Sequence, residues 1–383
     1  MDNLLSGITG FGWQNMVMFI IAGILIYLAI AKDYEPMLLL PIGFGAILAN
    51  IPLSSAISHD GFLSILYNAG IKSELFPVLI FIAVGAMIDF GPLLQNPFML
   101  FFGAAAQFGI FATMMASIFL GDWLKDFGLG IQIGLKEAAA IGIIGAADGP
   151  TSIYVANKFA KDLLAPITVA AYSYMSLVPI IQPPVIKLLT SKQERLIRME
   201  PCEVKIPQIV KILFPILVTV ISGIIAPISV ALVGSLMFGN LIRECGVLER
   251  LSKSAQGELA NLVTLLLGIT IGSTMVAGEF LKPATILIML LGLLAFVFDT
   301  AGGVLFAKLL NLFLKRKVNP MVGAAGISAF PMSARVIQRM AQKEDPTNFV
   351  LMQAVSANVA GQLGSIVAGG MLLAIVPALL GGK

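Results

Sequence analysis

Long apolar segments alternate with short polar ones from one end of the chain to the other. In the first half, the apolar segments cover residues 13–31, 37–52, 75–90, 99–120 and 163–189. In the second half, they cover residues 209–225, 227–242, 260–277, 284–314 and 349–380. A helix needs about 20 mostly apolar residues to cross a bilayer, and most of these segments approach or exceed that length. The pattern predicts an all-α, polytopic membrane protein.

Two further apolar segments, 137–158 and 319–340, are interrupted near their middle. The first contains Gly-Ala-Ala-Asp-Gly-Pro-Thr-Ser-Ile from Gly145, and the second contains Gly-Ala-Ala-Gly-Ile-Ser-Ala-Phe-Pro from Gly323. Helix breakers and polar residues at bilayer depth are typical of broken helices that line a polar cavity. Two such segments in corresponding halves of a chain indicate the binding site of a transporter. We expect each to form a re-entrant hairpin.

The two halves of the chain resemble each other. Residues 44–51 are similar to residues 234–241, residues 85–91 to residues 272–278, and the first interrupted segment to the second. The longest polar run, 190–207, separates the halves. We therefore expect two repeats, 1–189 and 208–383, joined by this linker, each with about five transmembrane helices and one hairpin. An odd number of crossings in each repeat inverts the second repeat relative to the first.

Composition agrees with a membrane protein and indicates its orientation. Of the 383 residues, 58% are hydrophobic and 12% are charged, which is about half the charged share of a soluble domain. With the linker placed in the cytoplasm, most of the 24 lysines and arginines fall on that side, as the positive-inside rule requires. We expect an integral protein of a bacterial or archaeal cytoplasmic membrane, in contact with lipid and not with nucleic acid, with both termini outside.

The sequence argues against several other functions. It contains one histidine, His59, in a polar segment, and two cysteines without metal-like spacing, so a Cys/His metal site is not expected. It has no nucleophile elbow and no glycine-rich nucleotide loop. Because nothing in it indicates ATP hydrolysis, the energy for transport has to come from a gradient or from a partner.

Asp148 is the strongest candidate for ion binding. A carboxylate at bilayer depth costs about 2.5 kcal/mol or more and is normally kept for an ion or proton pathway. As an alternative, Asp148 caps the helix that Gly149 and Pro150 open, and capping is compatible with ion binding. Asp89 and Asp299 also interrupt apolar runs. Asp89 lies at a span end and is expected to face water, whereas the role of Asp299 stays open.

Polar residues surround the second interruption and the middle of the last span. They are Asn319, Ser328, Ser333 and Arg335 at the interruption, and Ser356, Asn358, Gln362 and Ser365 in the span. Carboxylate, amide, hydroxyl and freed backbone oxygens together suit a small hard cation. Two alternatives stay open: Arg335 either pairs with an anionic substrate or snorkels to the membrane surface, and the last span could use its polar residues only for interhelical hydrogen bonds. In the matching span of the first half stand Tyr172 and Tyr174, and a buried tyrosine more often belongs to the core than to a catalytic site.

Four motifs together point to a family. They are Gly-Ala-Ala-Asp-Gly-Pro-Thr-Ser-Ile from Gly145, Ser-Tyr-Met-Ser-Leu-Val-Pro-Ile-Ile-Gln-Pro-Pro from Ser173, Asn-Pro-Met-Val-Gly-Ala-Ala-Gly-Ile-Ser-Ala-Phe-Pro from Asn319, and Ala-Asn-Val-Ala-Gly-Gln from Ala357. Over nearly its whole length, the chain resembles the beta subunit of the sodium-pumping, biotin-dependent decarboxylases, which act on oxaloacetate, glutaconyl-CoA, methylmalonyl-CoA or malonate.

The resemblance implies a carboxybiotin decarboxylase subunit of a sodium-translocating enzyme. In that family, a carboxyltransferase alpha subunit moves a carboxyl group from the substrate to biotin on a biotin carrier subunit. The beta subunit then decarboxylates carboxybiotin, exports sodium and consumes a proton from outside. The implied cofactors are sodium and carboxybiotin, which is not attached to this chain. The implied partners also include a small membrane gamma or delta subunit and further copies of the chain.

The resemblance also implies roles for particular residues. It implies that the sodium ligands are Asp148, Asn319 and Asn358. It implies a part in coupling or proton delivery for Tyr174, Gly323, Ser328 and Arg335, and binding of carboxybiotin for Arg335. Alternating access, with the two interrupted segments as one moving unit, would carry sodium outward. A gradient-driven sodium/carboxylate symporter is the main rival interpretation, because broken inverted repeats serve symporters equally well. A non-catalytic membrane anchor is the third.

Overall fold

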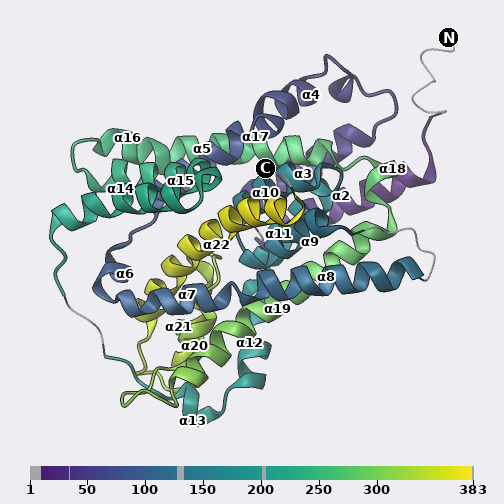
Figure 1. The fold of residues 1–383 in the computed structure, drawn as a ribbon. Coiled ribbons are helices and arrows are strands. Elements are labelled where there is room, and N and C mark those ends of the chain that lie inside the picture. The colour runs from purple at the N-terminus through teal and green to yellow at the C-terminus, as the bar shows by residue number, and fades with distance from the viewer. Residues whose placement is uncertain (1–9, 34, 127–132, 201–203, 382–383) are drawn as a thin grey trace.

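The protein is helical throughout the part that the structure describes. The structure, a computed structural model, describes residues 10–33, 35–126, 133–200 and 204–381, and these contain helices and no strand (Figure 1). The predicted all-α fold is confirmed for this part of the chain.

Among the described residues of the first half, ten α-helices precede α12. They are α2 (Trp13–Lys32), α3 (Pro36–Asn50), α4 (Phe62–Leu66), α5 (Leu75–Met87), α6 (Gly91–Gln95), α7 (Leu100–Ala106), α8 (Phe108–Asp126), α9 (Leu135–Gly142), α10 (Gly149–Phe159) and α11 (Leu164–Ser176). They are followed by α12 (Val178–Leu189).

The linker and the second half continue the helical chain. They contain α13 (Lys192–Arg195), α14 (Gln208–Ile225), α15 (Val230–Glu244), α16 (Glu249–Ser254), α17 (Ala260–Ser273), α18 (Ala277–Phe280), α19 (Pro283–Leu310), α20 (Pro320–Ala324), α21 (Met332–Glu344) and α22 (Leu351–Leu379).

Fewer helices have full spanning length than the apolar pattern predicts. Within the described residues, six helices are long and apolar enough to cross a membrane, and up to eight if each of two bent helix pairs forms one span. The sequence predicts ten. The difference lies mainly in α3, α5 and α15, which have 15, 13 and 15 residues. These short helices pack against other helices over much of their surface, so the lipid thickness does not fix their length.

Two crossed helix pairs, α3 with α17 and α5 with α15, form the scaffold. Both crossings depend on glycine. A Cβ atom at Gly272 of α17 would lie 2.1 Å from the carbonyl oxygen of Ile42, and one at Gly239 of α15 would lie 2.0 Å from the carbonyl oxygen of Ile82. Small residues allow this close backbone approach, which gives membrane helices their van der Waals contact.

An asparagine side chain holds each of these crossings. Asn50 donates to the carbonyl of Met275, just after α17, over 2.7 Å. Asn240 donates to the carbonyl of Ile88, just after α5, over 2.9 Å. The two asparagines occupy matching positions in the similar segments 44–51 and 234–241. The similarity between the halves therefore extends to a matched pair of interhelical hydrogen bonds.

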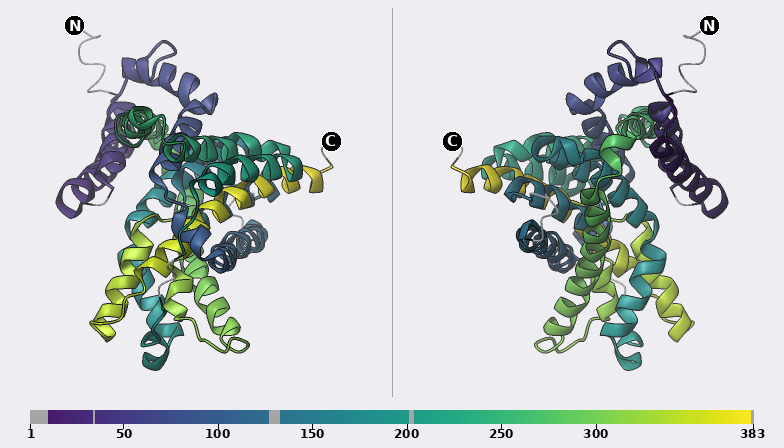
Figure 2. Two further views of the ribbon diagram at one scale, coloured as in Figure 1. Left: turned by 90° about the vertical axis from the view of Figure 1, so that its left-hand side faces the viewer. Right: turned by 90° about the vertical axis from the view of Figure 1, so that its right-hand side faces the viewer.

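The linker packs against the end of the molecule opposite α4, where α13 and α21 lie (Figures 1 and 2). We call this the linker end and define it by residues 190–200, Lys308 and Glu344. Arg195 pairs with Glu344 over 2.7 Å, and Lys308 pairs with Glu194 over 3.2 Å. Hydrogen bonds from Thr347 and Arg198 lower the pKa of Asp345 to about 2, so the negative charge of Asp345 persists above that pH.

The outer helices present apolar surface of the kind that faces lipid. On α14, large apolar side chains are exposed along the whole helix: Ile209, Leu213, Ile216, Leu217, Val220, Ile221, Ile224 and Ile225. On α2, Trp13 is 72% exposed. An exposed apolar surface of this extent is not found on ordinary soluble monomers. Together with the spanning helices, it fits an integral membrane protein.

The glycine crossings give a test of the scaffold. Replacing Gly272 by Ala would force the α3–α17 crossing apart, because the new Cβ meets the backbone of Ile42. Overpacking of this kind costs about 1–3 kcal/mol. We expect a lower melting temperature of the purified protein in detergent. Gly23→Ala in α2 is the matched control, since a Cβ there meets nothing within 4 Å. Equal melting temperatures for the two variants would contradict the crossing.

Candidate functional site

The first interruption is a sharp change of backbone direction at Ala147 and Asp148. A 3₁₀ turn, Ile143–Ala146, ends α9, and Ala147 then adopts a left-handed conformation with φ of 54°. Asp148 is extended and precedes α10, which opens with Gly149 and Pro150. Its Oδ1 atom accepts a hydrogen bond from the backbone N–H of Thr151 over 3.3 Å. Asp148 is thus the N-cap of α10, as the capping alternative has it.

Capping accounts for only one of the two carboxylate oxygens. The Oδ2 atom accepts hydrogen bonds from Thr151 Oγ1 over 2.6 Å, from Gln362 Nε2 over 3.0 Å and from Ser365 Oγ over 2.9 Å. Asp148 is only 4% exposed. Its partners in the described part of the chain are all neutral, so no lysine or arginine balances its charge there. Such a site fits a mobile cation.

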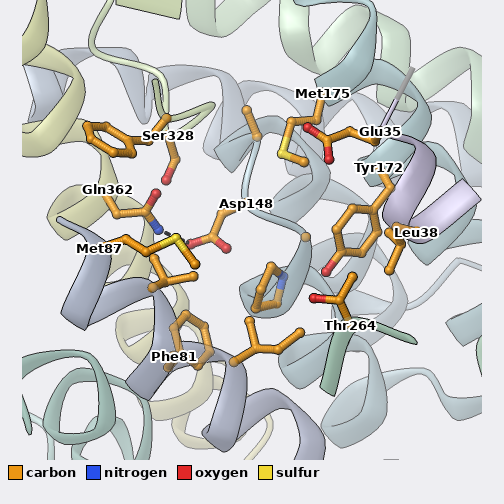
Figure 3. A pocket seen from close by; sticks show the side chains of 16 residues that line it. Glu35, Leu38, Phe81, Met87, Asp148, Tyr172, Met175, Thr264, Ser328 and Gln362 are labelled. Atoms are coloured by element: carbon orange, nitrogen blue, oxygen red, sulfur yellow. Dashed lines mark hydrogen bonds between the residues drawn. The ribbon is translucent and has the colours of Figure 1, made fainter. Parts of the chain in front are cut away.

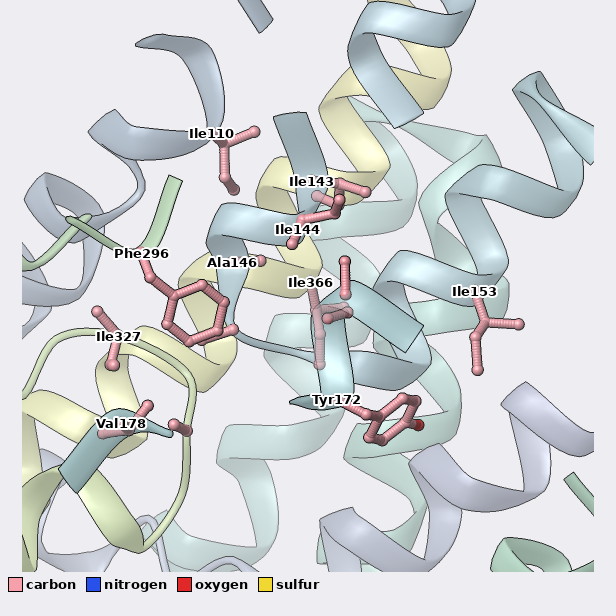
Figure 4. Close-up of a cluster of buried hydrophobic side chains, with 14 of the residues drawn as sticks. Ile110, Ile143, Ile144, Ala146, Ile153, Tyr172, Val178, Phe296, Ile327 and Ile366 are labelled. Carbon is pink, nitrogen blue, oxygen red and sulfur yellow. The ribbon is translucent and has the colours of Figure 1, made fainter. Parts of the chain in front are cut away.

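The second interruption lies against the first. The backbone N–H of Ser328 donates to the carbonyl of Ala146 over 3.3 Å, and Ser328 Oγ lies 3.0 Å from Ser365 Oγ. Apolar side chains from both interruptions and from α22 surround this junction, among them Ile143, Ile144, Ile327 and Ile366 (Figure 4). The two interrupted segments and the middle of α22 therefore meet at one buried point.

Asn358 brings an unused oxygen to the same region. Its amide nitrogen donates to the carbonyl of Ile327, next to Ser328, over 2.6 Å. Its Oδ1 atom is fully buried and has no hydrogen-bond partner among the described residues. A buried acceptor left without a partner costs about 1–3 kcal/mol. A cation close to Asn358 would remove that cost.

Asn319 is placed elsewhere. Its amide nitrogen donates to the carbonyls of Arg195 and Ile197, each over 2.9 Å, and its Oδ1 accepts from the backbone N–H of Met321. Asn319 thus caps α20 and holds the linker, and it has no contact with Asp148. The reason is its position in the segment: it stands at the start of α20, whereas Ser328 stands at the interruption. In this structure, Asn319 is not part of the polar cluster around Asp148.

The structure gives Gly323 and Arg335 different surroundings from Ser328. A Cβ at Gly323 would lie 2.1 Å from the carbonyl oxygen of Gly303, so this glycine allows α20 to pack closely on α19. Arg335 is exposed on α21. Its side chain makes no hydrogen bond or ion pair with another described residue, which leaves its guanidinium available at the protein surface.

The two tyrosines of α11 face different parts of the molecule. The Tyr174 hydroxyl donates to the carbonyl of Met289 in α19 over 2.6 Å, and its ring packs near Phe296. Tyr172 instead lines the cavity that Asp148 faces. A Cβ at Gly149 would lie 2.0 Å from the Tyr172 ring, so the ring lies directly over the start of α10.

A cavity of about 220 Å³ adjoins Asp148. Its polar lining consists of Asp148, Gln362, Ser328, Tyr172, Thr264 and Glu35, and its apolar lining includes Phe81 and Phe330 (Figure 3). Pockets for drug-sized ligands have about 300–1,000 Å³. This cavity is smaller, and its polar groups suit a small ion with water better than an organic substrate.

The donor set near Asp148 suits a hard cation. No group of three or more His, Cys, Asp or Glu side chains capable of holding a metal exists among the described residues. The oxygens near the junction come from one carboxylate, two amides and hydroxyl groups. Such oxygen donors are typical of hard cations and not of transition metals, which prefer nitrogen and sulfur.

The other two aspartates of the apolar runs differ from Asp148. Asp89 has a side chain that is 46% exposed, near Arg243, in agreement with its position at a span end. Asp299 is buried in α19, and a Cβ at Gly109 would lie 1.9 Å from its Oδ1 atom, so it faces the beginning of α8. Asp299 is not a lining residue of the Asp148 cavity.

Sequence reasoning missed three polar groups of the site. Thr151 donates the shortest hydrogen bond to Asp148. In the sequence, however, a threonine after a proline indicates only an ordinary residue of the first helical turn. Thr264 is a single hydroxyl in an apolar run. Glu35 belongs to the charged group Lys32-Asp33-Tyr34-Glu35, which reads as a polar loop. Glu35 directly precedes Pro36 at the start of an apolar segment. This position at the edge of the membrane is the feature of the sequence that could have indicated a role for Glu35.

Comparison with known proteins gives a consistent result over nearly the whole chain. The family model described as Na⁺-transporting oxaloacetate decarboxylase beta subunit matches residues 14–376. Among similar proteins is the glutaconyl-CoA decarboxylase subunit beta of Acidaminococcus fermentans, 50% identical over 378 residues, which cover 99% of this chain and 96% of that protein.

Two further relatives act on different substrates according to their names. The methylmalonyl-CoA decarboxylase subunit beta of Veillonella parvula is 50% identical over 371 residues, covering 97% of this chain and 95% of that protein. The oxaloacetate decarboxylase beta chain 2 of Salmonella typhi is 44% identical over 428 residues, covering 97% of this chain and 98% of that protein.

The contacts of Asn319 give a test of its role at the linker. Asn319→Ala removes the cap of α20 and both hydrogen bonds to the linker, a loss of about 0.5–2 kcal/mol for the cap alone. We expect faster cleavage of the linker by trypsin. Gln193→Ala, at an exposed linker residue, is the control and should leave cleavage unchanged. If the two variants are cleaved at the same rate, the linker does not depend on Asn319.

Proposed function

The chain belongs to the family of the Na⁺-transporting oxaloacetate decarboxylase beta subunit, and on this premise we propose that it decarboxylates carboxybiotin carried by a partner subunit and couples this reaction to sodium export. It is an integral membrane component of a decarboxylase. The single observation that supports ion coupling is Asp148, buried, surrounded by neutral donors and facing a small polar cavity.

We propose that the transported sodium ion binds at the junction of the two interruptions. Its ligands are the Asp148 carboxylate, the unused Asn358 Oδ1 and the hydroxyls of Ser328 and Ser365. The hydrogen bonds that Ser365 and Gln362 give to Asp148 keep the carboxylate in place when no ion is bound. Asn319 stays a proposed ligand only for a conformation in which α20 has moved, because its amide now holds the linker.

We further propose that the chain consists of two inverted repeats, 1–189 and 208–383. The matched crossings support this: α3 crosses α17 as α15 crosses α5, with Asn50 and Asn240 in equivalent roles. The second interrupted segment also begins and ends near one residue of the linker end. Asn319 and Glu344 both contact Arg195, as expected for a re-entrant hairpin.

The positive-inside rule places the linker end in the cytoplasm of a bacterial or archaeal cell. The two hairpins then enter the membrane from opposite sides and meet at Asp148. In alternating access, the hairpins move together relative to the α3–α17 and α5–α15 scaffold, so that the sodium site faces first the cytoplasm and then the outside.

A basic groove at the linker end is the proposed docking place for carboxybiotin and its carrier. A cavity of about 330 Å³ between α12 and α21 is lined by Lys187, Arg339 and Lys343, together with Glu344. The three cations are exposed, and Arg335 lies one helical turn before Arg339. A carboxylated ring carries a negative charge, which these cations would attract.

The chemical step itself is simple. The bond between the biotin nitrogen and the carboxylate carbon breaks, carbon dioxide leaves, and the electron pair remains on nitrogen, which takes up a proton from outside. Tyr174 and Ser328 remain the proposed residues for delivering that proton, and Gly323 and Arg335 for coupling. Glycine at 323 fits this role because it lets α20 pack against α19 at close range.

The proposed assembly contains a carboxyltransferase alpha subunit, a biotin carrier subunit, a small gamma or delta membrane subunit and further copies of this chain. Sodium is the transported ion, and carboxybiotin is supplied by the carrier. No nucleic acid takes part.

The first test concerns the ion site. We expect Asp148→Asn to abolish sodium stimulation of carboxybiotin decarboxylation and sodium uptake into proteoliposomes, because the amide cannot offer a charged ligand. Asp89→Asn is the control, since Asp89 interrupts an apolar run in the same way but is 46% exposed, and it should retain both activities. A gradient-driven symporter would instead move sodium and a carboxylate without biotin. A membrane anchor would leave decarboxylation intact in Asp148→Asn.

The second test concerns the basic groove. Arg339→Glu removes one attraction and adds a repulsion, so we expect the KM for the carboxylated carrier to rise roughly 3- to 10-fold at low salt, a cost of about 1 kcal/mol. The effect should decrease with ionic strength. Lys253→Glu on α16 is the control with the same change of charge. Equal KM values for both variants would show that the carrier docks elsewhere.

A further inference from the structure

The Asp148 cavity contains a second carboxylate that neither the motifs nor the proposed ligand set includes. Glu35 lies between α2 and α3 and is one of the cavity-lining residues. In Figure 3, Asp148 lies in the middle, with Ser328 and Gln362 on one side and Tyr172 and Glu35 on the other. The cavity therefore has a carboxylate at Asp148 and another across from the Ser328 side.

The ordinary structural explanation for Glu35 does not hold. Glu35 occupies the N-cap position of α3, where an acidic side chain often accepts hydrogen bonds from the first turn. Its side chain makes no such hydrogen bond. It also forms no ion pair with a lysine or arginine among the described residues, and nearby Lys32 is exposed.

The backbone holds Glu35 in an unfavourable conformation. Its φ is 37° and its ψ is 59°, in the left-handed region, although glutamate carries a Cβ and the next residue is Pro36. For a residue other than glycine, this region costs roughly 1–2 kcal/mol. Strain of this kind is found at functional sites, where the surrounding structure holds the residue in place. Here the strained residue is one that lines the ion cavity.

The surroundings of Glu35 favour a bound cation. Burial, followed by the negative charge of Asp33, raises the pKa of Glu35 above its ordinary value. Both effects disfavour the ionised form when no positive charge is close. A sodium ion at the carboxylate would supply that charge. Water in the cavity would supply the remaining ligands, as is usual for a site of few protein oxygens.

The carboxylates of Glu35 and Asp148 differ in exposure, as expected for two residues that an ion meets one after the other on its way in from solvent. Glu35 is partly exposed, whereas Asp148 is buried. Tyr172 and Thr264 line the same cavity and offer hydroxyl oxygens. An ion that enters from solvent therefore meets Glu35 before it reaches Asp148. With the amino terminus outside, as the positive-inside rule leads us to expect, the segment after the first span, which contains Glu35, falls on the cytoplasmic side, from which the pump takes sodium.

We propose that Glu35 is a second cation-binding residue, which receives sodium from the cytoplasm and loads it into the Asp148 cavity. The proposal rests on the proposed function as a sodium pump. Glu35 raises the occupancy of the cavity at low sodium and takes no part in the release of carbon dioxide. Its loss should change the sodium requirement and leave the maximal rate unchanged.

The test compares Glu35→Gln with Asp33→Asn in the assembled decarboxylase complex. Asp33 is the neighbouring exposed carboxylate at the same end of α2, and it does not line the cavity. Decarboxylation is measured against sodium concentration, with potassium added to keep the ionic strength constant. We expect Glu35→Gln to raise the half-saturating sodium concentration roughly 3- to 10-fold with an unchanged rate at saturation. Asp33→Asn, which removes a charge that disfavours ionised Glu35, should not raise that concentration.

Two results would overturn the role of Glu35. One is a sodium curve of Glu35→Gln that superimposes on the wild type, and the other is a loss of maximal rate without a shift in sodium dependence. Glu35→Asp, which keeps the charge, should retain most of the sodium affinity. If Glu35→Gln does not assemble, Glu35→Ala takes its place with the same expected shift, and a wild-type sodium curve for that variant would also refute the role of Glu35.

The same experiment separates this inference from the proposed function. If the wild-type complex decarboxylates at the same rate with and without sodium, the pump itself is refuted, whatever Glu35→Gln does. If the wild type requires sodium and Glu35→Gln requires the same concentration, only the role of Glu35 is refuted.

Discussion

The structure depends on keeping one negative charge stable in an apolar environment. Asp148 is buried, and its carboxylate is held by neutral hydrogen-bond donors from α10 and α22. Removing an unpaired carboxylate from water is costly, so both interruptions have to place their polar groups at this point. The broken helices, the polar face of α22 and the small residues that let these segments approach all serve that requirement.

The scaffold and the site differ in how they are held. The α3–α17 and α5–α15 crossings rely on glycines in backbone contact and on asparagine side chains that bond to the opposite helix. Close-packed contacts of this kind have little freedom to change. The two interrupted segments meet each other through a few hydrogen bonds, such as the one from Ser328 to Ala146, although the second also packs closely on α19 at Gly323. The proposed alternating access requires that the hairpins move while the crossings stay fixed.

Much of the fold and part of the site could be predicted from the sequence. The helical membrane fold follows from the lengths of the apolar segments, and the polar spacing of Asn358, Gln362 and Ser365 predicts one face of α22, two of whose residues contact Asp148. Helix breakers beside a carboxylate mark the first interruption. These features are local and repeat with the period of a helix, so the chain displays them directly.

The remaining features depend on contacts between distant segments. Asn319 stands in a family motif, yet its partners Arg195 and Ile197 come from the linker, and no pattern within the motif reveals them. Tyr172 and Tyr174 stand two residues apart in the same apolar segment, and the sequence does not distinguish their roles. The packing of α11 places Tyr172 at the cavity and Tyr174 against Met289. The short lengths of α3 and α5 likewise reflect their crossings with the other half. Spacing along one segment carries no information about such contacts.

The central claim is that sodium binds where the two interruptions meet α22. The most direct measurement is a pair of high-resolution cryo-electron microscopy maps of the assembled complex, one in sodium and one in a buffer of an organic cation. The account predicts a density peak between the Asp148 carboxylate and Asn358 Oδ1 that is present only in sodium. A sodium-dependent peak elsewhere, with the junction unchanged between the two maps, would contradict it.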